Sequence, residues 1–183
     1  MFRNSRNVCL LLSIATLAAS CSTAPPQPAS STRTLPNRAG ASLSARPAIS
    51  AADYVSRAGS IDLFVIEASE LARQRSASTK IGDVADRLTV VHKRTSSELS
   101  LAGRRLNLLP SAALDAPHQA MLNRLRGAAD IAREYKSQME EVHREALALH
   151  SAYASHGSSP TLRPVAASIA PEMQQALRLL SYL

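Results

Sequence analysis

Apolar residues recur every three or four positions through most of the chain after residue 50, a spacing that predicts amphipathic helices. The first helix is expected to begin near Ser50, where Ser50 and Asp53 are spaced as in a capping box, and to run to about Gln74. Its inward stripe consists of Tyr54, Ala58, Ile61, Val65, Ala68 and Ala72. The segment RQRSAST interrupts the pattern, and a second helix is expected from about Thr79 to Arg105.

The remaining helices follow a longer connection, LNLLPSAALDAP. A short helix to about Leu125 and a long helix from about Ala128 to Ser155 are expected, then a last helix from Ser159-Pro160 to about Leu180. Pro171 lies inside this last helix and should kink it. Four amphipathic helices and a short extra one predict an all-α fold, a four-helix bundle.

The first twenty residues are typical of a secretory signal peptide. Arg3 and Arg6 precede an apolar run from Val8 to about Ala19, which is short for a bilayer-spanning helix. Leu17 and the small residues at 18–20 lead into Cys21, and this stretch resembles the lipobox of bacterial lipoproteins. That resemblance implies cleavage between Ser20 and Cys21 and acylation of the Cys21 thiol. The alternative is a soluble secreted protein cut near Ala19, with an unmodified thiol.

Cysteine usage favours the lipoprotein. The chain has 2 cysteines, and Cys9 would leave with the signal peptide, so Cys21 could form no internal disulfide. Ser22 follows the cysteine, which favours the outer membrane, facing the periplasm, in a cell with two membranes. The predicted layout is a signal peptide over residues 1–20, a flexible tether rich in Pro, Ser and Ala over residues 21–50, and the bundle over residues 51–183.

Charge changes this picture little. Lysine and arginine total 21 and aspartate and glutamate 14, a net charge of +7, but the two signs are mixed along the chain and aromatic residues make up only 3%. A nucleic-acid surface would concentrate the positive charge and use aromatic side chains, so nucleic acid is excluded as a partner. The expected partners are the membrane, through the N-terminal lipid, and an envelope protein or a second copy of the chain.

Candidate chemistry rests on two histidines. His92 falls on the inward stripe of the second helix, and His143 occupies a similar place in the long helix, where MEEVH echoes LTVVH. A buried imidazole either binds a metal ion or forms a hydrogen bond to a neighbouring helix. Gln138, Glu145 and His150 lie nearer the interior and are possible polar partners, whereas Glu140 is expected to face solvent.

Four segments together resemble the bacterial ferritin-like proteins of domain-of-unknown-function family 4142: FVIEASELA, LTVVH, EYKSQMEEVH and SIAPEMQQAL. The resemblance implies an exported ferritin-like four-helix bundle with a site for a transition metal, iron or zinc, built from inward His and Glu residues. Members of that family often have Glu where this chain has Val65, and His where it has Ala176. The resemblance therefore carries over only to His92 and His143.

Two functions remain, and no other catalytic motif, such as GxSxG, is present. The first is an envelope lipoprotein whose non-catalytic bundle binds a partner or maintains the envelope. The alternative is a periplasmic metal-binding ferritin-like protein or oxidase that uses the inward histidines. The replaced ligand positions favour the first function.

Overall fold

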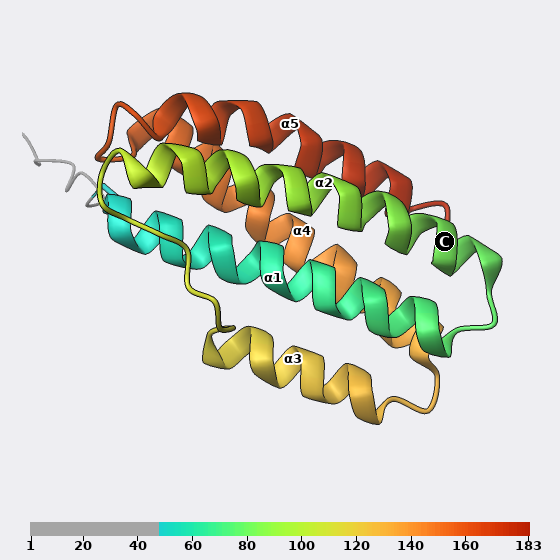
Figure 1. The fold of residues 1–183 in the computed structure, drawn as a ribbon. Coiled ribbons are helices and arrows are strands. Elements are labelled where there is room, and N and C mark those ends of the chain that lie inside the picture. Colours follow the sequence, from blue (N-terminus) through green and yellow to red (C-terminus); the bar gives the residue numbers. More distant parts are fainter. Residues whose placement is uncertain (1–47) are drawn as a thin grey trace, which may run out of the picture. The chain divides into compact units, whose positions relative to one another are not determined.

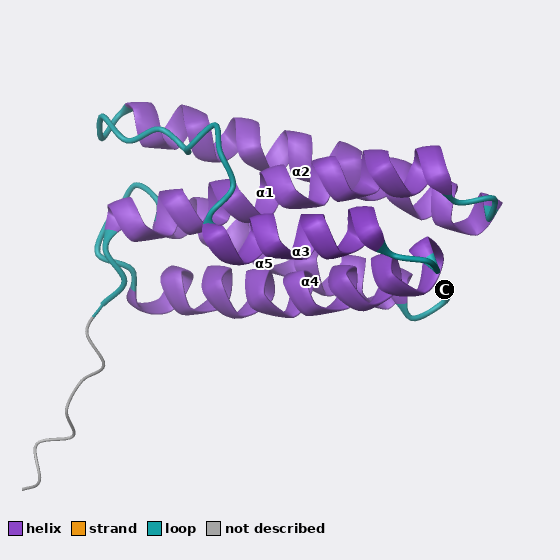
Figure 2. Cartoon of the chain, turned by 90° about the horizontal axis from the view of Figure 1, so that it is seen from below, coloured by secondary structure: helices purple, strands orange, loops and turns teal. Residues whose placement is uncertain are grey.

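The computed structural model describes residues 48–183, which form five α-helices and no strand (Figures 1 and 2). The helices are α1 (Ala51–Arg75), α2 (Thr79–Arg104), α3 (Ala116–Gly127), α4 (Ile131–His156) and α5 (Arg163–Leu180). The predicted signal peptide, the cleavage and acylation sites at Ser20 and Cys21, and nearly all of the predicted tether lie outside the described residues.

The helices form a four-helix bundle with one extra helix, as predicted. Short turns join α1 to α2 and α4 to α5, so each pair is an antiparallel hairpin, and α1 packs on α4 while α2 packs on α5. Residues 105–130, including α3, carry the chain back along the bundle, so that α2 and α4 run in the same direction (Figure 1). One long crossover between two hairpins is the connectivity of ferritin-like bundles.

Side-chain caps set the starts of four helices. The side chain of Ser50 accepts a hydrogen bond from the Asp53 amide, as the capping box predicts, and Ser78, Asp115 and Asp130 cap α2, α3 and α4. The Asp130 cap places the start of α4 at Ile131, three residues after the predicted start. The last helix begins at Arg163, because residues 160–162 form a turn, and it continues through Pro171 to Leu180.

The crossover packs closely on α1. At Gly59 it approaches so near that an added β-carbon would lie 2.5 Å from Pro110 Cβ, so a larger residue does not fit there. The backbone amide of Asp115 donates to Ser60 Oγ (3.0 Å), which fixes the start of α3 on α1. At the other end, Arg75 donates to the carbonyls of Arg126 (2.6 Å) and Ala128 (3.0 Å), where the helix dipole favours a cation. The short helix thus covers one side of α1 and α4.

The described residues contain no helix long and apolar enough to cross a membrane. Their core is mostly aliphatic and contains four fully buried aromatic rings: Tyr54, Phe64, Tyr135 and Tyr153. Tyr54 and Tyr153 stack with their ring centroids 3.8 Å apart. Inside this apolar core lie several buried polar side chains, and burying a polar group is costly unless it has a partner.

Candidate functional site

The two candidate histidines meet in the middle of the bundle. His92 extends from α2 and His143 from α4, and both side chains are fully buried. Their Nε2 atoms lie 3.2 Å apart, and the rings are nearly perpendicular, with centroids 5.1 Å apart. The bundle therefore brings together one histidine from each hairpin.

Asp62, from α1, holds His92 in place. Its Oδ1 atom lies 2.7 Å from His92 Nδ1, and the same oxygen accepts a hydrogen bond from the Thr95 hydroxyl at 2.9 Å. All three side chains are buried. A buried carboxylate that orients an imidazole through Nδ1 is the usual outer partner of a metal-binding histidine.

His143 is held from its own helix. Its Nδ1 atom lies 2.6 Å from the carbonyl oxygen of Met139, one turn earlier. A carbonyl oxygen can only accept a hydrogen bond, so Nδ1 of His143 carries the proton. Burial and then the neighbouring His92 lower the pKa of His143 to about 3, which keeps this ring neutral near pH 7.

These outer hydrogen bonds decide what the two Nε2 atoms can do. His143 donates its Nδ1 proton to the Met139 carbonyl, and a His92 ring that carries one proton and donates it from Nδ1 to the Asp62 carboxylate has no proton left on Nε2. Both Nε2 atoms then present lone pairs toward each other at 3.2 Å. Two lone pairs at this distance repel, so the arrangement is favourable only with a positive species between them, either an additional proton or a metal ion.

A second polar pair lies two turns along α4. The Tyr54 hydroxyl and His150 Nδ1 are 2.9 Å apart, and both side chains are buried. Burial raises the pKa of Tyr54 and lowers the pKa of His150 to about 3, so the phenol donates and the neutral imidazole accepts. His150 therefore partners with Tyr54 rather than with either central histidine.

Gln138 and Glu145, the other suggested partners, form their polar contacts with other residues. Gln138 is buried and donates to the Met121 carbonyl (2.9 Å) and to Glu134 (2.6 Å). Glu145 lies at the surface, where it pairs with Arg57 at 3.2 Å. Glu140, expected to face solvent, forms an ion pair with Arg144 at 2.8 Å.

Glu145 belongs to a cluster around His118 instead. His118, from α3, is buried, with Nδ1 2.9 Å from Ser60 Oγ and 2.8 Å from Asp115 Oδ1. Its Nε2 atom lies 3.5 Å from Glu145 Oε2, the outer limit of a hydrogen bond. Burial alone would lower the pKa of His118, but Glu145 and Asp115 outweigh it and raise that pKa. This cluster fastens α3 to the bundle.

Within the described part of the chain, no third ligand completes the histidine pair. Val65 and Ala176 are buried apolar residues. They occupy the two positions where members of the family that the sequence resembles often have Glu and His. Across residues 48–183 no group of three or more His, Cys, Asp or Glu side chains is placed to hold a metal ion. The described residues thus offer two nitrogen ligands, His92 and His143, and the Asp62 carboxylate orients the first of them.

Sequence reasoning missed Asp62 and Thr95. Thr95 lies three residues after His92 on the inward side of α2, and that position alone does not indicate its hydrogen bond to Asp62. Asp62 lies about 80° from Tyr54 by the helical step, at the edge of the inward stripe of α1, where a carboxylate is usually solvated. The one available signal was its place next to Ile61 and four residues after Ala58, on the buried side of an apolar helix.

A groove separates the hairpins at the surface, between α2 and α5. It has a volume of about 480 Å³, its floor includes Leu88, Val91 and Ala176, and Arg94 spans it to pair with Glu172. A second hollow of about 240 Å³ adjoins it near the end of α5. The hairpins are therefore packed less completely along this edge than within each hairpin.

Comparison with known proteins supports the architecture. The structure of "CopM in the Cu(II)-bound form" matches with a TM-score of 0.62 and 15% sequence identity, over 74% of this chain and 96% of that one. At this identity the likeness shows the same helical fold. None of the curated proteins compared with the chain matches it. The model of the family described as "Domain of unknown function (DUF4142)" matches residues 36–183, and the chain therefore belongs to this family.

Proposed function

We propose that this protein is a lipid-anchored envelope protein whose bundle binds one transition-metal ion between His92 and His143. The observation that carries the proposal is the pair of Nε2 atoms, 3.2 Å apart, with both Nδ1 atoms engaged by hydrogen-bond acceptors. The anchor rests on the lipobox-like sequence before Cys21. The sequence favoured the non-catalytic partner-binding bundle over the metal-binding protein. We now favour the metal-binding protein, because Asp62 orients His92 and the sequence did not reveal this contact.

The two histidines fit a metal ion in three respects. Metal-bound imidazole nitrogens lie about 2.0 Å from the ion, so two nitrogens 3.2 Å apart are within reach of one ion. His143 is already in the neutral form that binds metals. Asp62 supplies the outer carboxylate that raises the basicity of a bound imidazole.

The number of ligands narrows the choice of ion. Zinc is held by three or four protein ligands in nearly all stable sites, and iron in bundles takes several carboxylates as well. Imidazole suits copper, and divalent copper binds a given nitrogen site more tightly than zinc or iron does, so copper is the ion that two imidazoles favour best. The Cu(II)-bound form of CopM, a protein of similar fold, is consistent with this choice. A bound copper ion would supply one-electron redox chemistry, and the apolar core around the pair would keep water from it.

The competing occupant is a proton. An additional proton on Nε2 of His92 would be donated to His143, and Asp62 would balance the charge. A proton and a metal ion cannot occupy the same place, so metal binding should release a proton and weaken as the pH falls.

Thermal unfolding of the purified protein with and without metal tests the proposal. With Cu(II) at about a hundredfold excess over its dissociation constant, the folded state should gain about 2.7 kcal/mol. This gain should disappear in His92→Gln and in His143→Gln. Asp62→Asn should keep the ligands but weaken binding by about 10-fold to 100-fold.

His150→Gln is the matched control, since it removes a buried histidine from the same face of α4 without touching the pair. It should bind copper as the unaltered chain does, at one ion per chain. A copper-induced gain that survives in both His92→Gln and His143→Gln would refute the site. So would the absence of any gain with copper, zinc or iron.

A further inference from the structure

Positive charge is concentrated on the outer side of α2. Helix α2 and the residue that follows it contain six basic and three acidic residues, a net charge of +3. Most lysine and arginine side chains that form no ion pair within residues 48–183 belong to this segment. They are Lys80, Arg87, Lys93, Arg104 and Arg105, and all five are exposed.

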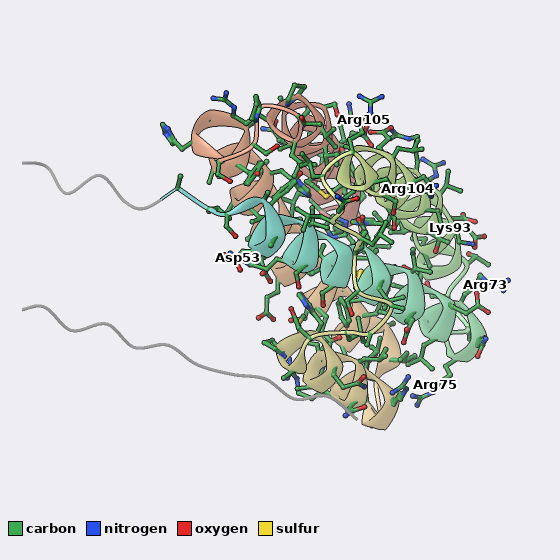
Figure 3. The ribbon with its side chains drawn as sticks, turned by 60° about the vertical axis from the view of Figure 1, so that its left-hand side comes forward. Asp53, Arg73, Arg75, Lys93, Arg104 and Arg105 are labelled. Atoms are coloured by element: carbon green, nitrogen blue, oxygen red, sulfur yellow. The ribbon has the colours of Figure 1, made fainter. Side chains whose placement is uncertain are left out.

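Aliphatic side chains lie between these cations. Val90 is 68% exposed and Leu101 is 62% exposed. Eleven residues apart, they lie within about 20° of each other around the helix, at the centre of its outer face. Lys93 and Arg104 flank this line on one side and Arg87 on the other. Figure 3 shows Lys93, Arg104 and Arg105 projecting outward from this side of the domain.

The three acidic residues of α2 do not cancel this charge. Glu98 pairs with Arg94 at 3.0 Å, and Asp86 lies 3.7 Å from Arg73 of α1. Asp83 is the remaining carboxylate and lies in the first two turns of the helix. The part of α2 after Arg87 therefore presents positive charge with apolar side chains between.

We propose that the outer face of α2 is an interfacial surface that lies on a bilayer rich in anionic lipid. Basic residues near such a surface attract lipid phosphates, while aliphatic side chains between them enter the headgroup region. Tyr182, 80% exposed, adjoins the same face, because it lines a hollow together with Lys80 and Arg87. An amphipathic aromatic ring is favoured at the boundary between water and lipid.

A bilayer explains this face better than nucleic acid does. Nucleic-acid surfaces place aromatic rings or hydrogen-bond donors among their cations, to stack on bases or read their edges. Here the central side chains are Val90 and Leu101, which can do neither. Aliphatic groups gain free energy by leaving water for the acyl boundary.

Binding to lipid vesicles tests the proposal with a chain from Ser22 to Leu183, which cannot carry the lipid yet contains all five helices. It should sediment with vesicles of phosphatidylcholine mixed with phosphatidylglycerol, not with phosphatidylcholine alone, and high salt should release it. Lys93→Gln combined with Arg104→Gln should reduce the partition coefficient about 25-fold, since each cation contributes about fivefold.

Two matched controls make the test specific. Lys136→Gln with Arg163→Gln removes the same charge from α4 and α5 and should change binding little. Leu109→Ser, in the crossover, replaces a leucine that is 65% exposed and should also have little effect, whereas Val90→Ser with Leu101→Ser should weaken binding several-fold. Circular dichroism checks that each variant is folded.

Three outcomes would overturn the proposal. They are equal losses in the two charge variants, equal binding to neutral vesicles, and binding to double-stranded DNA without binding to anionic vesicles.

Discussion

The metal-free domain should lose stability steeply in mild acid. His143 and His150 are buried and neutral, and burial holds the pKa of each at about 3, against about 6.5 in an unfolded chain. Because their folded pKa values are depressed, the unfolded chain binds the protons first. The contribution of these two histidines to the free energy of unfolding is therefore constant above about pH 6.5 and declines as the pH falls from about 6.5 toward 3.

The magnitude follows from linkage. Each group contributes a slope of somewhat more than about 1 kcal/mol per pH unit in this interval, so the two together give about 3 kcal/mol per unit. Between about pH 6.5 and 4.5 the loss reaches about 5 kcal/mol, comparable to the whole stability of many small domains. The domain should therefore unfold near pH 4 to 5.

Urea unfolding followed by circular dichroism, with a chelator present, measures this slope at several pH values. His150→Gln should cost about 1 kcal/mol near neutral pH through the lost hydrogen bond to Tyr54, yet it should halve the slope. Because the variant loses stability more slowly as the pH falls, it should be as stable as the unaltered chain about one pH unit below the onset of the decline, which lies near about pH 6.5. His156→Gln, at an exposed position, is the control. A flat stability between about pH 6.5 and 5, or an unchanged slope in His150→Gln, would refute the reasoning.

Three further predictions concern other parts of the chain. Gly59→Ala should lower the melting temperature, because overpacking against Pro110 costs about 1–3 kcal/mol and exceeds the helix-propensity gain, whereas Gly82→Ala, with no atom within 4 Å of the added carbon, should raise it. The pKa of His118 is raised in the folded state, so its contribution to the free energy of unfolding is full below its unfolded pKa and is lost as the pH rises through its folded pKa. Urea denaturation should therefore show that His118→Gln loses more stability near about pH 6 than near about pH 9. Cys21→Ser should abolish labelling of the protein by a radioactive fatty acid, and persistent labelling would contradict acylation of that thiol.

Most of the fold was predictable from the sequence, because the apolar spacing and the capping residues indicated the same helices. Apolar spacing located the helices, and Ser50 with Asp53 marked the start of the first one. The stripes also placed His92 and His143 inside, where the structure has them. Helix starts differed by three to four residues at α4 and α5, because caps and turns depend on local geometry that spacing does not contain.

The contacts of the site depended on the packing of separate helices. Apolar spacing does not give the register of α2 against α4, so the approach of the two Nε2 atoms was not predictable from it. Glu145 was expected near the interior, but α3 covers that flank of α4 and supplies His118 as its partner. Asp62, at the edge of its stripe, becomes buried only because α2 brings His92 and Thr95 against it.

The crossover also determines when the proposed site comes into existence. Asp62 and His92 are 30 residues apart and belong to one hairpin, whereas His92 and His143 are 51 residues apart and meet only when the hairpins dock. Contacts of short sequence separation cost less chain entropy to close, so the first hairpin can orient His92 before its partner arrives. An ion captured at that stage would be enclosed by the docking itself. Its escape would then require the two hairpins to separate, which makes the lifetime of the bound ion a measure of how often the bundle opens.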